Sequence, residues 1–343
     1  MIFPSSHPDS SVQRTEPSPS GKKKILLLKP RSFCAGVVRA IETVEIALET
    51  FGAPIYVRRE IVHNRHVVQE LSQKGAVFVQ EVDEVPDGER VIFSAHGVSP
   101  AVRQRSRERK LKVIDATCPL VTKVHIEAVR FAKQGNSLVL IGHRNHDEIE
   151  GTFGEAPDSI QIVGSVREVE ALQVPDPNRV AYLTQTTLSL DDARSIIEAL
   201  KQKFPAIVGP RSQDICYASE NRQMAVRSVA KRAELVIVVG SANSSNSNRL
   251  VEVARSQGAS SYLVDNFKSI DPTSLLGVST VAVTAGASAP EVLVEGVVDY
   301  LRQSGFDSIE EDEAVVENVH FNLPSELTRA VTEASRARPV GVQ

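Results

Sequence analysis

The three cysteines of this 343-residue chain stand at equivalent positions of a pattern that occurs three times. Cys34, Cys118 and Cys216 lie in the segments SFCAG, DATCPL and DICYA. Each is followed by a stretch with helical periodicity, which in the first copy places four apolar residues on one face: Val37, Ile41, Val44 and Leu48. A fold that repeats three times around a ring would bring the three thiols to one point on its axis.

The remainder of each copy follows a common order of strands and polar loops. One predicted strand in each copy enters a polar loop: VHNRH (62–66), HRNHDE (143–148) and SANSSNSNR (241–249). A later strand enters a second loop: AHG (95–97), TQTT (184–187) and AGASAP (285–290). His96, Thr186 and Ser288 in these second loops come 62, 68 and 72 residues after the cysteine of their own copy. Agreement at three places favours a true structural repeat.

The third copy lacks the strand that should follow its last helix, residues 290–303. A matching strand, ILLL (25–28), precedes Cys34 instead, whereas AIV (206–208) is predicted to be the strand before Cys216. We therefore predict that the ring closes through the N-terminal strand. Alternating strands and helices are typical of α/β units with parallel sheets, which bind ligands beyond the carboxyl ends of their strands.

The repeat predicts an α/β fold of three similar lobes in a pseudo-threefold ring. We expect lobes at 24–117, 118–215 and 216–310, with a disordered N-terminal extension (1–23) and a C-terminal segment and tail (311–343). The extension is rich in Ser and Pro and has no periodicity, and the tail after about Glu326 is expected to be loosely ordered.

Composition excludes several classes of protein. A net charge of −4 gives no broad basic field for nucleic acid, and no apolar run is long enough to cross a bilayer. The first residues have no apolar core of the kind found in a secretory signal. An odd number of cysteines without such a signal argues against disulfides and for a reducing, cytoplasmic location.

Three cysteines near helix N-termini indicate metal binding, because unpaired N–H groups and the helix dipole there favour thiolates. Thiolates select iron–sulfur clusters, zinc or copper(I). Three ligands suit a cubane cluster with one iron that lacks a cysteine, and such an iron could bind a substrate oxygen. Spacing alone leaves zinc open. A single free cysteine would more often be a small buried apolar residue, but three at equivalent positions favour the ligand interpretation.

The strand-end loops are rich in hydroxyl, amide and imidazole groups and contain few charges. This set suits an anionic, oxygen-rich ligand such as a phosphate or diphosphate. The loop residues are His63, His96, His143, His146, Glu148, Thr186, Thr187, Ser244, Ser245, Asn246 and Ser288. Glu148 follows His146 by two residues and is the best candidate for proton delivery. The alternatives are that Glu148 only begins a helix and that SSNSN only caps one.

At these residues the chain resembles the bacterial 4-hydroxy-3-methylbut-2-enyl diphosphate reductase family, over essentially all of 24–310. The matching segments include PRSFCAGV (30–37), VHNRHVV (62–68), FSAHGVS (93–99), DATCPLVTKVH (115–125), GHRNHDEIEGT (142–152), TQTTLS (184–189), DICYASENRQ (214–223), VVGSANSSNSNRL (238–250) and VTAGASAP (283–290). One departure adds a charge: the family usually has His-Pro-Glu where this chain has His146-Asp147-Glu148.

The resemblance implies a central [4Fe–4S] cluster held by Cys34, Cys118 and Cys216. It implies that the substrate pocket is lined mostly around the diphosphate by His63, His96, His146, Ser244, Ser245, Asn246 and Ser288. Glu148 and Thr186 would then be the catalytic residues at the hydroxymethyl end of the substrate.

The implied reaction is reductive removal of the allylic hydroxyl as water, which gives isopentenyl and dimethylallyl diphosphate for isoprenoid synthesis. Electrons would come from a partner such as ferredoxin or flavodoxin, with neither nucleic acid nor membrane involved. Two other classes remain open from the residues alone: a zinc hydrolase on the same thiolates, and a non-catalytic iron–sulfur sensor or carrier.

Overall fold

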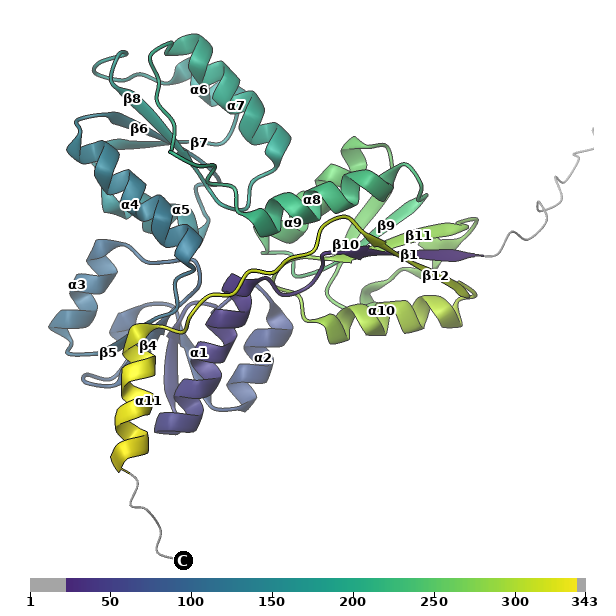
Figure 1. The fold of residues 1–343 in the computed structure, drawn as a ribbon, viewed down its shortest axis with the longest axis horizontal. Coiled ribbons are helices and arrows are strands. Elements are labelled where there is room, and N and C mark those ends of the chain that lie inside the picture. Colours follow the sequence, from purple (N-terminus) through teal and green to yellow (C-terminus); the bar gives the residue numbers. More distant parts are fainter. Residues whose placement is uncertain (1–22, 338–343) are drawn as a thin grey trace, which may run out of the picture.

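Three parallel sheets, each with helices around it, form three lobes about a common centre (Figure 1). The computed structural model describes residues 23–337, so the predicted disordered extension lies outside the described residues except for Lys23. Every pair of adjacent strands is parallel among the residues described. The α/β class and the three-lobed arrangement predicted from the repeat are therefore confirmed.

The first sheet has the order β3-β2-β4-β5. Its strands are β2 (Ile55–Arg58), β3 (Ala76–Val79), β4 (Arg90–Phe93) and β5 (Lys112–Asp115). The helices of this part are α1 (Ala35–Phe51), α2 (Arg65–Gln73) and α3 (Pro100–Glu108), with a short 3₁₀ turn at Val82–Glu84.

The second sheet has the order β7-β6-β8. Its strands are β6 (Ser137–Ile141), β7 (Ile160–Val163) and β8 (Val180–Thr184), and its helices are α4 (Pro119–Lys133), α5 (Asp147–Glu155), α6 (Val166–Ala171) and α7 (Leu190–Lys203). The predicted strand at 206–208 is reduced to one parallel bridge between Ala181 and Val208. Pro205 and Pro210 flank this bridge, and proline cannot donate to a strand ladder, so the pairing stays short.

The third sheet has the order β10-β9-β11-β1-β12. Its strands are β1 (Lys24–Lys29), β9 (Leu235–Val239), β10 (Ser260–Val264), β11 (Thr280–Ala285) and β12 (Ser308–Glu313). The helices are α8 (Tyr217–Ala230), α9 (Ser245–Ser256) and α10 (Glu291–Gln303), with 3₁₀ turns at Phe267–Ser269 and Pro272–Leu275. β1 pairs with β11 in the place that β5 takes beside β4, so the ring closes through the N-terminal strand as predicted.

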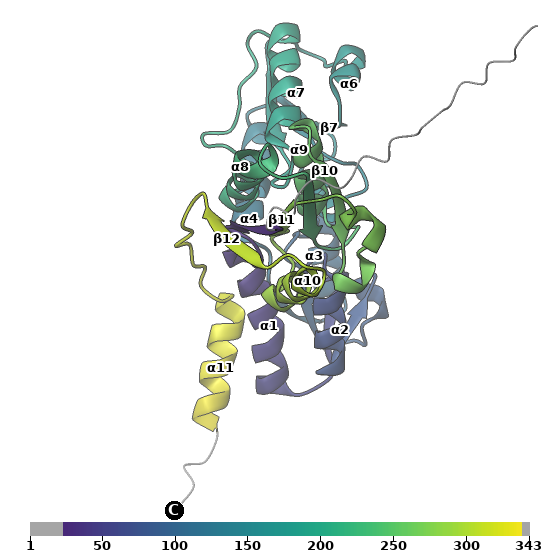
Figure 2. The ribbon, with the colours of Figure 1, turned by 90° about the vertical axis from the view of Figure 1, so that its right-hand side faces the viewer.

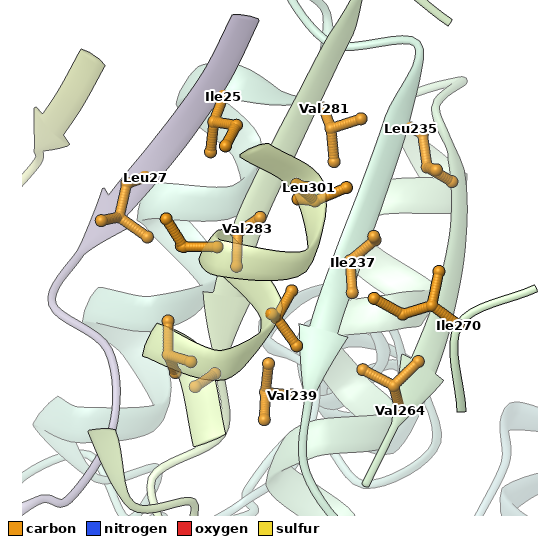
Figure 3. Packing of buried hydrophobic residues seen from close by; sticks show 14 of the residues in the cluster. Ile25, Leu27, Leu235, Ile237, Val239, Val264, Ile270, Val281, Val283 and Leu301 are labelled. Atoms are coloured by element: carbon orange, nitrogen blue, oxygen red, sulfur yellow. The ribbon is translucent and has the colours of Figure 1, made fainter. Parts of the chain in front are cut away.

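Neighbouring residues along each strand of the third sheet point to opposite faces, and both faces are buried. Leu27, Ile237 and Val283 pack against α10 on one face, where Leu301 lies over the strands (Figure 3). The intervening Leu26 and Val238 pack on the opposite face against residues of α8 and α9. Full burial of such a side chain contributes roughly 1.5–3 kcal/mol to stability relative to an exposed one. The helices on both faces therefore hold the strand ends in place.

The C-terminal segment is more ordered than the sequence predicted. β12 adds an edge strand to the third sheet, and the chain then runs along the outside of the molecule into α11 (Ser325–Ala337), beside α1 (Figures 1 and 2). Leu327 is fully buried in the core of the first lobe. The expectation of a loose tail after Glu326 is therefore wrong up to Ala337, because an apolar face of this helix finds a partner in α1.

Candidate functional site

Each of the three cysteines is the N-cap of a helix at the centre of the molecule. Cys34 precedes α1, Cys118 precedes α4 and Cys216 precedes α8. The N–H of each cysteine donates to a carbonyl of a predicted strand-end loop: Cys34 to Ala287 at 3.2 Å, Cys118 to Ala95 at 3.0 Å and Cys216 to Thr186 at 3.0 Å. Each cysteine is therefore joined by a hydrogen bond to the strand-end loop of the preceding copy of the repeat.

One cavity brings together all three thiols and every residue that the family resemblance assigns to the site. It lies where the three lobes meet and has a volume of about 110 Å³. Its lining includes Cys34, Cys118, Cys216, His63, His96, His146, Glu148, Thr186, Ser244, Ser245, Asn246 and Ser288. Residues more than 250 positions apart in the chain therefore share one site.

The three sulfur atoms are spread more widely than a single metal ion needs. Among the described residues, only His63, His96 and Asp147 form a trio of ligand-type side chains whose donor atoms all lie within 4.8 Å of one another. A tetrahedral zinc ion with Zn–S bonds of about 2.3 Å would hold its sulfurs about 3.8 Å apart. The cysteine geometry therefore suits a larger inorganic group than one ion.

A glycine keeps space open between two of the thiols. A Cβ atom on Gly36 would lie 2.7 Å from Cys118 Sγ and 3.9 Å from Cys34 Sγ. Contacts below about 3 Å are not tolerated, so any other residue at position 36 would displace the Cys118 sulfur. The absence of a side chain there fits a site in which the space next to the sulfurs holds a bound group.

Burial, rather than the helix dipole, dominates the acidity of two thiols in the metal-free protein. Burial raises the pKa of Cys118 to about 12 and that of Cys216 to about 11, although backbone N–H groups oppose the rise. The backbone N–H groups at these helix N-termini lower the pKa of both thiols, as predicted, but burial raises it by more. Metal binding displaces the thiol protons, so the site would load with release of protons.

Three histidines cluster on the side of the cavity formed by the first two lobes. The His63 and His96 rings stack with centroids 3.9 Å apart, and His146 lies edge-on to both at 5.2 and 5.7 Å. Burial lowers the pKa of His96 far below its usual range and that of His146 to about 4. At neutral pH these two rings are neutral, and an anion bound between them would raise their pKa values again.

Glu148 and Thr186 form a buried pair across the second lobe. The Thr186 N–H donates to Glu148 Oε1 at 2.6 Å and the Thr186 hydroxyl donates to Oε2 at 2.9 Å. Only 2% of Glu148 is exposed, and this burial raises its pKa to about 7 despite the two hydrogen bonds. A carboxyl group with that pKa is suited to donate a proton near neutral pH.

The third lobe supplies hydroxyl and amide groups. Ser244 caps α9, and its hydroxyl lies 3.5 Å from that of Ser288, which donates to the His63 carbonyl. The Asn246 side chain accepts from the Ala287 N–H at 2.8 Å and donates to the Ser219 hydroxyl at 3.2 Å. SSNSN therefore caps α9 and lines the cavity at once, so the two interpretations of this segment both hold.

Asp147 is the first residue of α5, next to Glu148. Its carboxylate pairs with the Arg59 guanidinium of the first lobe at 2.5 Å. Arg59 has a left-handed backbone (φ 55°) and also pairs with Glu150 at 2.8 Å. The added charge therefore ties the start of α5 to the first lobe rather than leaving it loose.

Two loop residues differ from expectation. His143 is not in the lining of the central cavity and instead borders a separate surface hollow with Arg249. Gln185, which was not singled out, is fully buried and donates to both Thr187 and Ser245, joining the second and third lobes. Its place directly before the predicted site residues Thr186 and Thr187 in TQTT was the available signal.

The fold and the site together define a three-lobed α/β protein in which a trio of thiols shares a cavity with hydroxyl, amide and imidazole groups. Residues 25–302 match the LytB protein family. The chain belongs to this family.

Two relatives of high identity carry the same name. The chain is 58% identical over 316 residues to "4-hydroxy-3-methylbut-2-enyl diphosphate reductase" of Acidothermus cellulolyticus, covering 92% of this chain and 93% of that one. It is 57% identical to the protein of the same name from Azoarcus sp., covering 90% and 98%.

Among solved structures, the chain is similar to the E-1-hydroxy-2-methyl-but-2-enyl-4-diphosphate reductase from Plasmodium falciparum. The TM-score is 0.90 at 41% identity, with 92% of this chain and 100% of that chain covered. A second reductase structure, described as the terminal enzyme of the non-mevalonate pathway, matches at a TM-score of 0.59 and 29% identity.

Proposed function

We propose that this chain reduces 4-hydroxy-3-methylbut-2-enyl diphosphate to isopentenyl and dimethylallyl diphosphate, with release of water, at a [4Fe–4S] cluster held by Cys34, Cys118 and Cys216. The observation that carries this proposal is that three thiols, each at the N-cap of a helix, lie in one cavity. The same cavity contains neutral side chains that can donate hydrogen bonds to an anion. The relatives' common name supports the substrate and the products.

The cysteine geometry supports a cluster over a single zinc ion. The sulfurs are too widely spread for one tetrahedral ion, Gly36 leaves space beside two of them, and the chain has three cysteines in all. A [4Fe–4S] cluster with three cysteine ligands would supply single electrons and one iron able to act as a Lewis acid. These points also make a zinc hydrolase the weaker alternative.

The diphosphate would lie among residues of all three lobes. His63, His96 and His146 are close enough to donate to one anion, and the same cavity is lined by Ser244, Ser245, Asn246 and Ser288. The N-termini of α5 and α9 begin at His146 and Ser244, so their free N–H groups and dipoles add to the attraction. Such a cage would hold the substrate in one orientation, which is a large term in catalysis.

Glu148 and Thr186 would deliver the proton that allows the hydroxyl to leave. Protonated Glu148 can donate to Thr186, whose hydroxyl can pass a proton to the leaving oxygen. The balanced reaction consumes two electrons and two protons: the C–O bond breaks, one proton leaves in water, and the other adds to one of two allylic carbons. The side chains that close the cavity would exclude water from the reactive fragment.

The electrons must come from another protein, and we include a small one-electron carrier such as ferredoxin or flavodoxin in the proposal. A cytoplasmic location is consistent with three free thiols in one cavity, which a reducing compartment would keep from oxidation. No helix in residues 23–337 is long and apolar enough to span a membrane.

Anaerobic turnover tests the proposal. Protein purified without oxygen is supplied with a strong one-electron reductant and 4-hydroxy-3-methylbut-2-enyl diphosphate, and the two five-carbon diphosphates are assayed. Their formation is the expected result. Cluster-loaded protein that forms neither product would contradict the proposal and favour a non-catalytic sensor or carrier.

A further inference from the structure

Three cations stand at matching positions on the helices that begin at the cysteines. Arg39 follows Cys34 by five residues on α1, Lys123 follows Cys118 by five on α4, and Arg222 follows Cys216 by six on α8. Arg222 is the largest fully buried side chain of the described residues, and Arg39 is also buried. A buried charge is costly unless it is paired, so each of these cations is expected to have hydrogen-bond partners.

Each cation reaches the loop that carries the next cysteine around the ring. Arg39 donates to the carbonyl of Thr117, directly before Cys118, at 3.0 Å. Lys123 donates to the carbonyls of Ser212 and Gln213 before Cys216, at 2.7 and 2.9 Å. Arg222 donates to the carbonyl of Ser32 before Cys34, at 2.7 Å. The three contacts close a circle in which every cysteine helix holds the neighbouring cysteine loop.

The remaining contacts of the cations differ from one lobe to the next. Lys123 pairs with the Asp214 carboxylate at 3.1 Å, and Arg222 pairs with Glu317 at 3.0 Å. Arg39 donates to the Asn322 carbonyl at 2.7 Å. Two of the cations therefore also fasten the C-terminal segment between β12 and α11, which gives that segment a role in holding the centre together.

We propose that Arg39, Lys123 and Arg222 form a cation ring that positions the three cysteine loops as one unit around the metal group. The proposal rests on the cluster assignment above. Each cysteine is then held from two sides: its own N–H is bound to a neighbouring strand-end loop, and the carbonyls ahead of it are bound to a cation. Groups that orient metal ligands in this way typically change metal affinity about 10–100-fold when they are removed.

Lys123 offers the best test because 28% of its side chain is exposed, so its loss leaves no fully buried cavity. In Lys123→Met the apolar stem remains and the donors are lost. We expect this variant to lose iron to a chelator at least about tenfold faster than wild-type protein, at a temperature well below the melting point of both. Lys123→Arg, which keeps charge and donors, should restore a rate near that of wild type.

Lys133→Met is the matched control, because Lys133 is exposed at the far end of the same helix. It should lose iron at the wild-type rate. Equal rates of iron loss for wild type and Lys123→Met would contradict the proposed cation ring. So would a Lys123→Arg variant that loses iron as fast as Lys123→Met. Arg39→Lys gives a second position: Arg39 reaches Asn322 through Nε and Thr117 through Nη1, and lysine has a single nitrogen, so faster loss is expected. A wild-type rate would contradict the proposal.

The iron and sulfide content of the wild-type protein separates the two proposals. If wild-type protein holds a cluster and the variants lose it at the same rate, the ring alone is wrong. If wild-type protein prepared without oxygen holds no iron, the cluster assignment and the ring that depends on it are both wrong.

Discussion

At the scale of single residues, the chemistry depends on how the cavity changes ordinary side chains. Burial raises the pKa of Glu148 to about 7 and lowers those of His96 and His146, so at neutral pH the two rings are neutral and Glu148 is about half protonated. Sequence motifs identified these residues, but their protonation could not be predicted from sequence, because it depends on which side chains surround them.

Glu148→Gln should lower the turnover number by about 10²–10⁴-fold and leave cluster content unchanged, because general acids typically contribute that much. Rates of product formation and iron content would be measured together. Glu168→Gln, on the exposed surface of α6, is the control and should behave as wild type. Normal turnover in Glu148→Gln would remove Glu148 from the mechanism.

The same substitution should change stability in a pH-dependent way. Burial raises the pKa of Glu148 from 4.5 to about 7, so ionisation of this carboxyl opposes folding as pH rises between those values. In cluster-free, reduced protein, Glu148→Gln should be more stable than wild type by roughly 3 kcal/mol at pH 8. The difference should vanish below pH 4.5. Denaturation curves that differ equally at both pH values would contradict this pKa.

At the scale of helices and strands, the repeat predicted most elements, because apolar periodicity and polar loops are local signals. β12 was missed since its sequence, SIEEDE, is acidic and pairs only with β1 at the edge of the sheet. α11 was missed because a short helix gains its stability from packing on α1, although Leu327 and Val331 have the spacing of one helical face.

Leu327→Ala tests whether α11 belongs to the core. The fully buried side chain packs in the first lobe, so its truncation should lower the free energy of unfolding by about 2–5 kcal/mol. Val316→Ala, in the C-terminal segment with a 63% exposed side chain, should cost much less. Equal, small effects of both changes in denaturant titrations would show that α11 does not pack as described.

At the scale of the whole molecule, the three sheets share a core order of three strands: β3-β2-β4, β7-β6-β8 and β10-β9-β11. β1 adds to the third sheet from the other end of the chain. This closure brings three cysteines to the centre, as the residue spacing predicted. The sequence could not predict the contacts between lobes, such as the Asp147–Arg59 ion pair or the buried Arg222, because they join residues far apart in the chain. The lobe boundaries at 24, 118, 216 and 311 remain predictions.

The central claim is that one thiol from each lobe holds a single cluster. The most direct measurement is the iron and acid-labile sulfide content of protein purified without oxygen, for wild type and for Cys34→Ala, Cys118→Ala and Cys216→Ala. We predict one [4Fe–4S] cluster per chain in wild type and loss of the cluster and of reductase activity in each variant. Wild-type iron, sulfide and turnover in any one of the three variants would contradict the account.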